Sequence, residues 1–177
     1  MKFYISDTHF GHENIIKHAN RPFESVLEMD EAMVQNWNSV VKSGDLVYHV
    51  GDFCWNKPKQ YRERLNGNII LILGNHDKRL TTGEKTKFFE QVYDYKKIKD
   101  NGHSIVLFHY PIWSWDGLYR GTHHFYGHVH GHKGPRSQGG EVNIEGNKKG
   151  KMINVSVEKI NYTPRTIEEL ISGSYKR

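Results

Sequence analysis

Three short apolar runs in the first half of the sequence each stop at a cluster of polar residues. The runs span 2–6, 45–50 and 68–73. Runs of this length bounded by turn residues are typical of buried strands. Segments with helical spacing separate them, and alternation of strand and helix favours βαβ units with a mostly parallel sheet. The first half of the chain therefore predicts an α/β protein.

Helix signals lie in the segments between these runs. Ser25 and Glu28 form an S-x-x-E capping box, apolar residues then recur at helical spacing, and Gly44 follows as a stop. Shorter helices are expected near Glu13 and over 58–65, which begins with a proline.

The second half has a different pattern. Strands are predicted at 92–99 and 103–111, around a D-N-G turn, and at 123–132 and 152–157. Thr166 and Glu169 form the capping box of a C-terminal helix. Glycine and lysine are frequent from Lys133 to Lys151, which predicts a mobile loop. Since there is no repeat and no linker, we expect a single domain over residues 1–177, with two packed sheets and helices outside them.

Composition narrows the class of protein. The 177 residues are 36% hydrophobic and 25% charged, which is typical of a soluble globular domain. No apolar run approaches the roughly 20 residues that span a bilayer, and the first residues lack the features of a signal peptide. The single cysteine, Cys54, excludes an internal disulfide framework, so we expect a cytoplasmic protein, with Cys54 packed near the site. A net charge of +5 fits an anionic partner, although basic surfaces often serve only solubility.

Carboxylate, imidazole and carboxamide side chains gather where the predicted strands end. They are Asp7, His9, Asp52, Asn75, His76, Asp77, His109, His128 and His130. In open α/β sheets, ligands bind beyond the carboxyl ends of the strands. The pairs Asp7/His9 and His128/His130 are spaced i, i+2, which in extended backbone puts both side chains on one face. We therefore expect these groups to form one site.

These residue types suit a metal. Each short motif alone is more often a capped turn than a ligand set, and only the joint pattern at successive strand ends favours a metal site. The mixture suits manganese, iron, zinc or nickel better than a structural zinc held by cysteines. It also provides more ligands than one ion needs, so two ions bridged by one carboxylate would use them all.

The ordered set D-x-H, G-D, G-N-H-D, H and G-H-x-H resembles the calcineurin-like metallophosphoesterase superfamily. The match covers Asp7 to His130, most of the chain. The stretches "ISDTHFGHENII", "NRPF", "NWN" and "GDF" look like its small single-domain bacterial and phage branch. The resemblance implies a metallo-dependent phosphatase fold, a four-layer α-β-β-α sandwich of two mixed sheets flanked by helices. It also implies two divalent metal ions, manganese first, with iron, zinc, nickel or magnesium as alternatives.

The resemblance assigns roles to the matching residues. One metal is held by Asp7, His9 and His130. The other metal is held by Asn75, His109 and His128. Asp52 matches the bridging carboxylate, and His76 matches the catalytic histidine that is not a ligand; Asp77 is expected to orient it.

The implied reaction is hydrolysis of a phosphate ester. A hydroxide that bridges the metals attacks phosphorus, and His76 protonates the leaving oxygen as general acid. The protein-phosphatase branch continues G-D as G-D-x-x-D-R-G, whereas this chain reads "GDFCWN" and lacks the arginine. His130 completes the G-H-x-H pattern of the phosphodiesterase-like branches. We therefore expect a phosphodiester or nucleotide small-molecule substrate, with nucleic acid possible but not favoured.

Substrate contacts are weaker predictions. His12 and Asn14 either touch phosphate or cap the helix near Glu13. Arg21 either reaches the site or fixes a turn. Trp113, Trp115 and Arg120 lie between two ligand strands, where they either stack on a nucleotide or form a packed lid. His132, Lys133 and Arg136 begin the basic loop, which either steers an anion or is simply solvated.

Other functions compete with a phosphodiesterase. A phosphomonoesterase or a dinucleoside-polyphosphate hydrolase would use the same ligands. A nucleic-acid-binding module with structural metals would need no His76, and the sequence has no zinc-finger, RRM or basic-helix signature. A nuclease for duplex DNA would need a capping domain, for which so short a chain has little room.

Overall fold

The first sheet contains the three strands expected in the first half and one more. The computed structural model describes residues 1–131 and 150–176. The strands are β1 (Lys2–Ile5), β2 (Leu46–His49), β3 (Asn68–Ile72) and β4 (Gln91–Tyr93), in the order β1-β2-β3-β4. Every neighbouring pair is parallel, so the βαβ prediction for this half is confirmed.

The second sheet is mixed. Its strands are β5 (Tyr95–Asp100), β6 (His103–Phe108), β7 (His123–Tyr126) and β8 (Met152–Asn154), in the order β5-β6-β7-β8. β5 and β6 form an antiparallel hairpin, whereas β6, β7 and β8 run parallel. Asn101 and Gly102 both have positive φ, as the expected two-residue turn requires. The expectation of mixed sheets therefore holds for the second sheet and not for the first.

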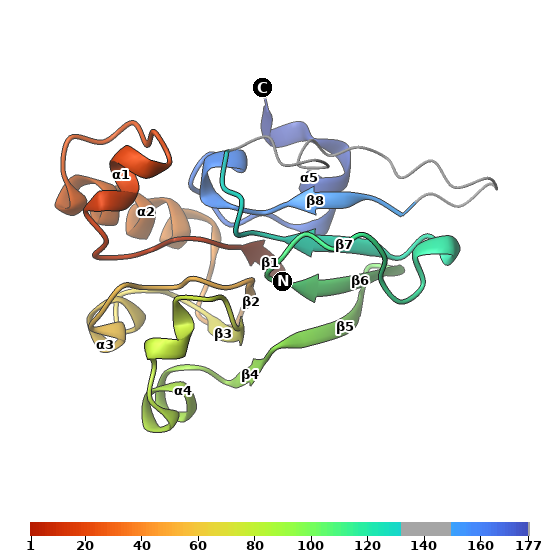
Figure 1. Cartoon of the computed structure of the whole chain (residues 1–177), viewed down its shortest axis with the longest axis horizontal. Helices are drawn as coiled ribbons and strands as arrows, with labels where there is room; N and C mark the ends of the chain where they lie inside the picture. Colours follow the sequence, from red (N-terminus) through yellow and green to blue (C-terminus); the bar gives the residue numbers. More distant parts are fainter. Residues whose placement is uncertain (132–149, 177) are drawn as a thin grey trace.

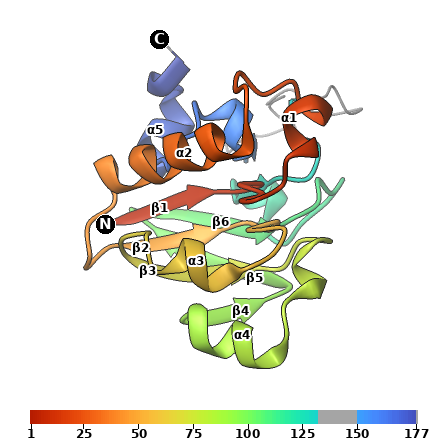
Figure 2. The same cartoon turned by 90° about the vertical axis from the view of Figure 1, so that its left-hand side faces the viewer.

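Helices cover the outer faces of the two sheets. The α-helices are α1 (Asn14–His18), α2 (Val26–Val40), α3 (Pro58–Arg62), α4 (Thr82–Phe88) and α5 (Ile167–Ser172). Short 3₁₀ turns are η1 (Asp77–Arg79), η2 (Leu118–Arg120), η3 (Val157–Lys159) and η4 (Ser174–Lys176). Figure 1 shows the strands in the middle of the molecule, and Figure 2 shows α2 and α5 above β1 with α3 and α4 below it. The predicted four-layer sandwich is confirmed.

The predicted helix starts are confirmed by their caps. The Ser25 hydroxyl accepts a hydrogen bond from the Glu28 amide, and α2 begins at the next residue. Thr166 and Glu169 form the complete reciprocal box at the start of α5. A side-chain cap of this kind typically stabilises a helix by about 1 kcal/mol.

Two elements differ from the sequence prediction. The segment 92–99 is not one strand, because the chain changes sheets at Asp94: the Leu73 amide donates to the Tyr93 carbonyl and keeps β4 in the first sheet, while β5 pairs with β6. The helix α4 was not predicted. Its signal was present as the Thr81/Glu84 capping box, but α4 has no buried residue and therefore no apolar stripe to reveal it.

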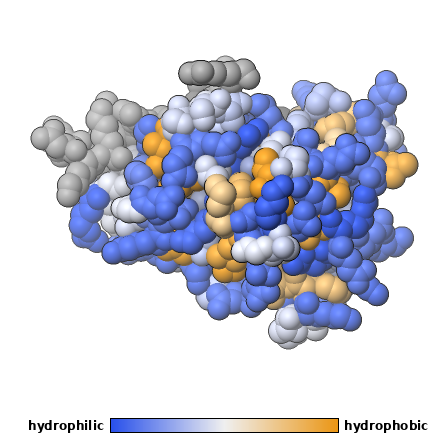
Figure 3. All heavy atoms as spheres, turned by 180° about the vertical axis from the view of Figure 1, so that it is seen from behind, coloured by the Kyte–Doolittle hydropathy of each residue, from blue (hydrophilic) through white to orange (hydrophobic). Residues whose placement is uncertain are grey.

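The core lies between the two sheets and under α2. Tyr4 of β1 meets Phe125 of β7 edge to face, with ring centroids 4.9 Å apart. Trp37 of α2 is fully buried, and its indole nitrogen donates to the Asn66 carbonyl at 2.9 Å. The face in Figure 3 is mostly hydrophilic, with small hydrophobic patches. In the described part of the chain, no helix is both long and apolar enough to cross a membrane.

Candidate metal centre

All seven predicted ligands lie at the carboxyl ends of the strands. Asp7 and His9 follow β1, Asp52 follows β2, Asn75 follows β3, and His109 follows β6. His128 and His130 follow β7. Asp7, His9, Asp52 and His109 are at most 2% exposed. Because these strands run in parallel within each sheet, their ends bring residues from distant parts of the chain together.

The backbone at this site is not extended, contrary to the prediction from the i, i+2 spacing. Five of the seven predicted ligands have positive φ angles between 48° and 70°. They are Asp7, His9, Asp52, His128 and His130. Left-handed backbone turns each side chain sharply at the strand end, and this turn brings the side chains together. Strain of this kind clusters at functional sites, where the surrounding structure holds it.

One group of ligands surrounds the Asp7 carboxylate. The His130 Nε2 atom lies 3.8 Å from Asp7 Oδ1, and His9 Nε2 lies 4.0 Å from the same oxygen. These three residues offer ligand atoms that all lie within 4.8 Å of one another. The serines Ser6 and Ser156 donate hydrogen bonds to the other Asp7 oxygen and fix its orientation.

A second group surrounds the Asn75 carboxamide. Asn75 Oδ1 lies 3.2 Å from His109 Nε2 and 3.0 Å from His128 Nδ1. The other ring nitrogen of His109 lies 2.8 Å from the Val50 carbonyl, so Nδ1 carries the proton and Nε2 faces the site. A backbone carbonyl that orients an imidazole in this way is common around bound metals.

Asp52 lies between the two groups. Its Oδ2 atom is 3.5 Å from His9 Nε2 and 3.4 Å from His109 Nε2. Burial opposes ionisation of Asp52, but the hydrogen bond and charge of His109 hold the pKa of this carboxyl below its ordinary value. Burial also opposes the charge on His109, yet Asp52 raises the pKa of His109 to about 9.

The residues fit a bound cation. Both ring nitrogens of His9 are buried without a hydrogen-bond partner in the described structure, which is uncommon for buried polar atoms. Burial also lowers the pKa of His9 well below its ordinary value, so its imidazole is neutral, the form that binds metal. Asp7, Asp52 and His109 form another set of ligand atoms within 4.8 Å of one another.

His76 lies beside these ligands and belongs to neither Asp/His set. Its ring is 5.2 Å from the His9 ring, and its backbone amide donates to Asp52 Oδ1 at 2.9 Å. The predicted orientation of His76 by Asp77 stays a prediction, because no hydrogen bond joins their side chains in the described part of the chain. The buried Asp77 carboxylate instead accepts hydrogen bonds from three backbone amides, those of Asp52, Phe53 and Gly74. Asp77 is therefore a positioning residue for the Asp52 loop.

Of the two alternatives predicted for Arg21, its contacts support the one in which it fixes a turn. Its buried guanidinium donates to the carbonyls of Asp7 and Thr8. It also pairs with Glu158 at 2.7 Å. Glu158 in turn contacts His130 Nδ1 at 3.0 Å. Sequence reasoning missed Glu158, because no motif marks it and its partners lie 28 and 137 positions away.

The glycines of three motifs leave room for the ligands. A β-carbon at Gly74 would lie 2.2 Å from Asp52 Oδ1, and one at Gly127 would lie 2.2 Å from Asp7 Oδ2. At Gly51 it would meet the His109 ring at 2.3 Å. These approaches are far inside van der Waals contact, so the glycines are required by the site itself.

The remaining predicted contacts have different outcomes. His12 does not cap α1; its ring stacks on Trp55, with centroids 3.9 Å apart, and lies 5.6 Å from the His9 ring. Asn14 is exposed at the start of α1, and its contact with substrate stays a prediction.

Arg120 pairs with Asp116 on the surface. Trp115 is buried and donates to the Thr122 carbonyl, as expected of a packed lid.

Trp113 is largely exposed. Cys54 is buried two residues after Asp52, and burial raises the pKa of its thiol to about 12. The predicted contacts His132, Lys133 and Arg136, together with most of the predicted loop 133–151, lie outside the described residues.

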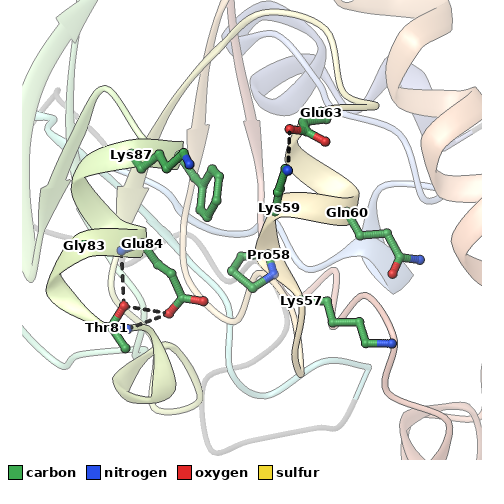
Figure 4. Close-up of a pocket in the computed structure, with 10 residues that line it drawn as sticks. Lys57, Pro58, Lys59, Gln60, Glu63, Thr81, Gly83, Glu84 and Lys87 are labelled. Atoms are coloured by element: carbon green, nitrogen blue, oxygen red, sulfur yellow. Dashed lines mark hydrogen bonds and ion pairs between the residues drawn. The ribbon is translucent and has the colours of Figure 1, made fainter.

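A groove of about 690 Å³ lies between α3 and α4 (Figure 4). Lys57, Pro58 and Lys59 form one side, and Thr81, Glu84 and Lys87 form the other. Its lining contains none of the predicted site residues.

Known proteins resemble this chain in sequence and in structure. No family model matches the chain. An uncharacterised protein of Methanocaldococcus jannaschii is 41% identical over 175 residues, which cover 96% of this chain and 88% of that protein. A protein of unknown function from Aquifex aeolicus has a similar structure, with a TM-score of 0.73 and 28% identity over 97% of this chain and 98% of that one.

A structurally characterised archaeal phosphodiesterase has the same fold. Its TM-score is 0.52 with 21% identity, over 86% of this chain and 81% of that one. The chain therefore shares the fold of this archaeal phosphodiesterase, and its ordered motifs lie at the strand ends of that fold.

Proposed function

We propose that the protein is a metal-dependent hydrolase of phosphate esters and that its substrates are phosphodiesters of nucleotide type. The observation that carries this proposal is the position of Asp52 Oδ2, within 3.5 Å of one imidazole from each ligand group, with His76 close by. A carboxylate in that place suits two cations better than one. His76 lies near the predicted ligands without belonging to either ligand group, a position that suits proton transfer.

Each ligand group would hold one divalent cation. The first would be held by Asp7, His9 and His130, and the second by Asn75, His109 and His128, with Asp52 shared. The ligand types favour manganese, with iron, zinc, nickel or magnesium as alternatives. When bound, such ions supply Lewis-acid charge and a more acidic water.

His76 would act on the leaving group. Its imidazole donates a proton to the departing oxygen, and general acid catalysis of this kind typically contributes about 10²–10⁴-fold. The His76 amide also holds Asp52, so one motif orients both a ligand and the acid. Arg21 and Glu158 keep the loop of Asp7 and the ring of His130 in place.

A diester is favoured over a monoester by charge. A phosphate monoester brings a second negative charge that an arginine usually neutralises, and "GDFCWN" lacks that arginine. The nearby Arg21 is buried and occupied by two carbonyls and Glu158. A phosphomonoesterase or a dinucleoside-polyphosphate hydrolase remains the alternative within enzymes. A single domain over residues 1–177, a cytoplasmic location and a small-molecule substrate remain predictions.

The ratio of two hydrolysis rates tests the proposal. Bis(p-nitrophenyl) phosphate and p-nitrophenyl phosphate are compared with added Mn²⁺, and again with excess chelator. We expect faster hydrolysis of the diester and loss of both activities with the chelator. Preference for the monoester would support a phosphatase instead. A metal-loaded protein without activity on either ester or on nucleotide diesters would support a binding module.

A further inference from the structure

We propose that Arg79, stacked on Trp55, is a specificity-determining residue that binds a second phosphate of the substrate, beyond the phosphate that is cleaved. This inference rests on the proposed function and adds the substrate class: a nucleotide diester whose leaving part carries another phosphate. Neither Trp55 nor Arg79 belongs to the ordered ligand motifs, and their relation is visible only in three dimensions.

Arg79 is tied to the His76 motif by a single 3₁₀ turn. The Arg79 amide donates to the His76 carbonyl, and η1 begins at the residue after His76. In a 3₁₀ turn, side chains three positions apart lie above one another. His76 and Arg79 therefore face the same side, so Arg79 lies on the side of the site where the leaving group departs.

Trp55 links the two side chains. Its ring centroid lies 5.4 Å from the His76 ring, and the Arg79 guanidinium carbon lies 3.6 Å above the Trp55 ring. His12 stacks in parallel against Trp55, at 5° between ring planes. The tryptophan ring is thus held by His12, and it holds the guanidinium by a cation–π contact.

The charge of Arg79 has no carboxylate partner within residues 1–131 and 150–176. Arg21, Arg64, Arg120 and Arg165 each contact an acidic side chain. Arg62 donates instead to three backbone carbonyls. Arg79 is exposed, and stacking uses the face of its guanidinium while leaving the N–H edge for an anion. That edge matches phosphate geometry, and the stack reduces the entropy lost on binding.

A basic groove begins close to the stack along the chain. The groove between α3 and α4 is lined by Lys57 and Thr81, each two residues after a member of the stack. Lys57, Lys59 and Lys87 line the same groove (Figure 4).

Binding of matched nucleotides tests this site. Isothermal titration of the Mn²⁺-loaded protein compares adenosine 3′,5′-bisphosphate with adenosine 3′- and 5′-monophosphate. We expect the bisphosphate to bind about tenfold or more tightly than either monophosphate, the size of a charged hydrogen-bonded contact. Arg79→Gln should remove that preference, and Arg79→Lys should keep part of it. Lys78→Gln, which removes the neighbouring charge in the same turn, should behave as the wild type.

Each other outcome is decisive. Equal affinities in the wild type would overturn the inference. So would equal weakening of all three nucleotides by Arg79→Gln, or the same effect from Lys78→Gln, since either result means unspecific attraction. If the wild type discriminates the nucleotides but hydrolyses no diester, the proposed function fails while the Arg79 site stands.

Discussion

Single residues hold the candidate site in an uncommon backbone conformation. Five predicted ligands have positive φ, and such positions typically cost about 1–3 kcal/mol each unless their surroundings hold them. Arg21 provides part of this support by donating to the Asp7 and Thr8 carbonyls. Asp77 provides another part through the amides of the Asp52 loop. The ligands are thus ordered by residues that do not bind metal themselves.

Gly74→Ala tests how closely the loops must approach. The added β-carbon would lie 2.2 Å from Asp52 Oδ1 and 2.6 Å from its backbone nitrogen, and backbone cannot easily move away. We expect a loss of roughly 1–3 kcal/mol in stability, measured by urea unfolding, and weaker Mn²⁺ binding. Gly83→Ala is the matched control, because its β-carbon meets nothing within 4 Å and Gly83 lies in α4. Equal behaviour of the two variants would contradict the steric account.

Asp77→Ala distinguishes a positioning residue from a partner of His76. The substitution leaves three backbone amides without their acceptor, and each unsatisfied buried group typically costs about 1–3 kcal/mol. We expect a clear drop in the unfolding midpoint together with weaker metal binding, because the Asp52 loop loses its anchor. A variant with unchanged stability and metal content but slow turnover would instead support the orientation of His76 by Asp77.

At the scale of the elements, the strand β7 makes the stability of the protein depend on pH through a buried histidine. His124 of β7 is buried, and burial lowers its pKa from 6.5 to about 4. In the unfolded chain, His124 therefore binds a proton below pH 6.5. In the folded chain, it binds a proton only below about pH 4. Stability from this group is present above pH 6.5 and falls as the pH decreases toward 4.

Urea unfolding of chelator-treated protein at pH 8 and pH 5 measures this effect. The lowered pKa of His124 alone should reduce the free energy of unfolding by about 2 kcal/mol at pH 5 relative to pH 8. His49 and His123 contribute in the same direction, because burial lowers their pKa to about 3 and about 4. His124→Asn should reduce the difference in unfolding free energy between pH 8 and pH 5 by the amount that His124 contributes. An unchanged dependence in this variant would show that His124 is not the titrating group.

For the molecule as a whole, local sequence patterns were enough to predict most strands and helices and the candidate metal ligands. The features that these patterns missed depend on contacts between residues that are distant in sequence. Strand ends followed by Asp, Asn and His were enough to predict one site, because parallel strands must end together. The change of sheet at Asp94 depends on which strand each segment pairs with, which no local pattern records. Glu158 and the Trp55–Arg79 stack likewise depend on neighbours that are distant in sequence.

The manganese content of the protein tests the central claim most directly. Wild-type, His76→Ala and Asp52→Asn proteins are loaded with Mn²⁺, separated from free metal and analysed by atomic emission. The proposed function predicts two ions per chain in the wild type and in His76→Ala, with turnover of the latter lower by about 10²–10⁴-fold, and fewer ions in Asp52→Asn. Loss of metal in His76→Ala, or a single ion in the wild type, would contradict a two-metal site with His76 outside it.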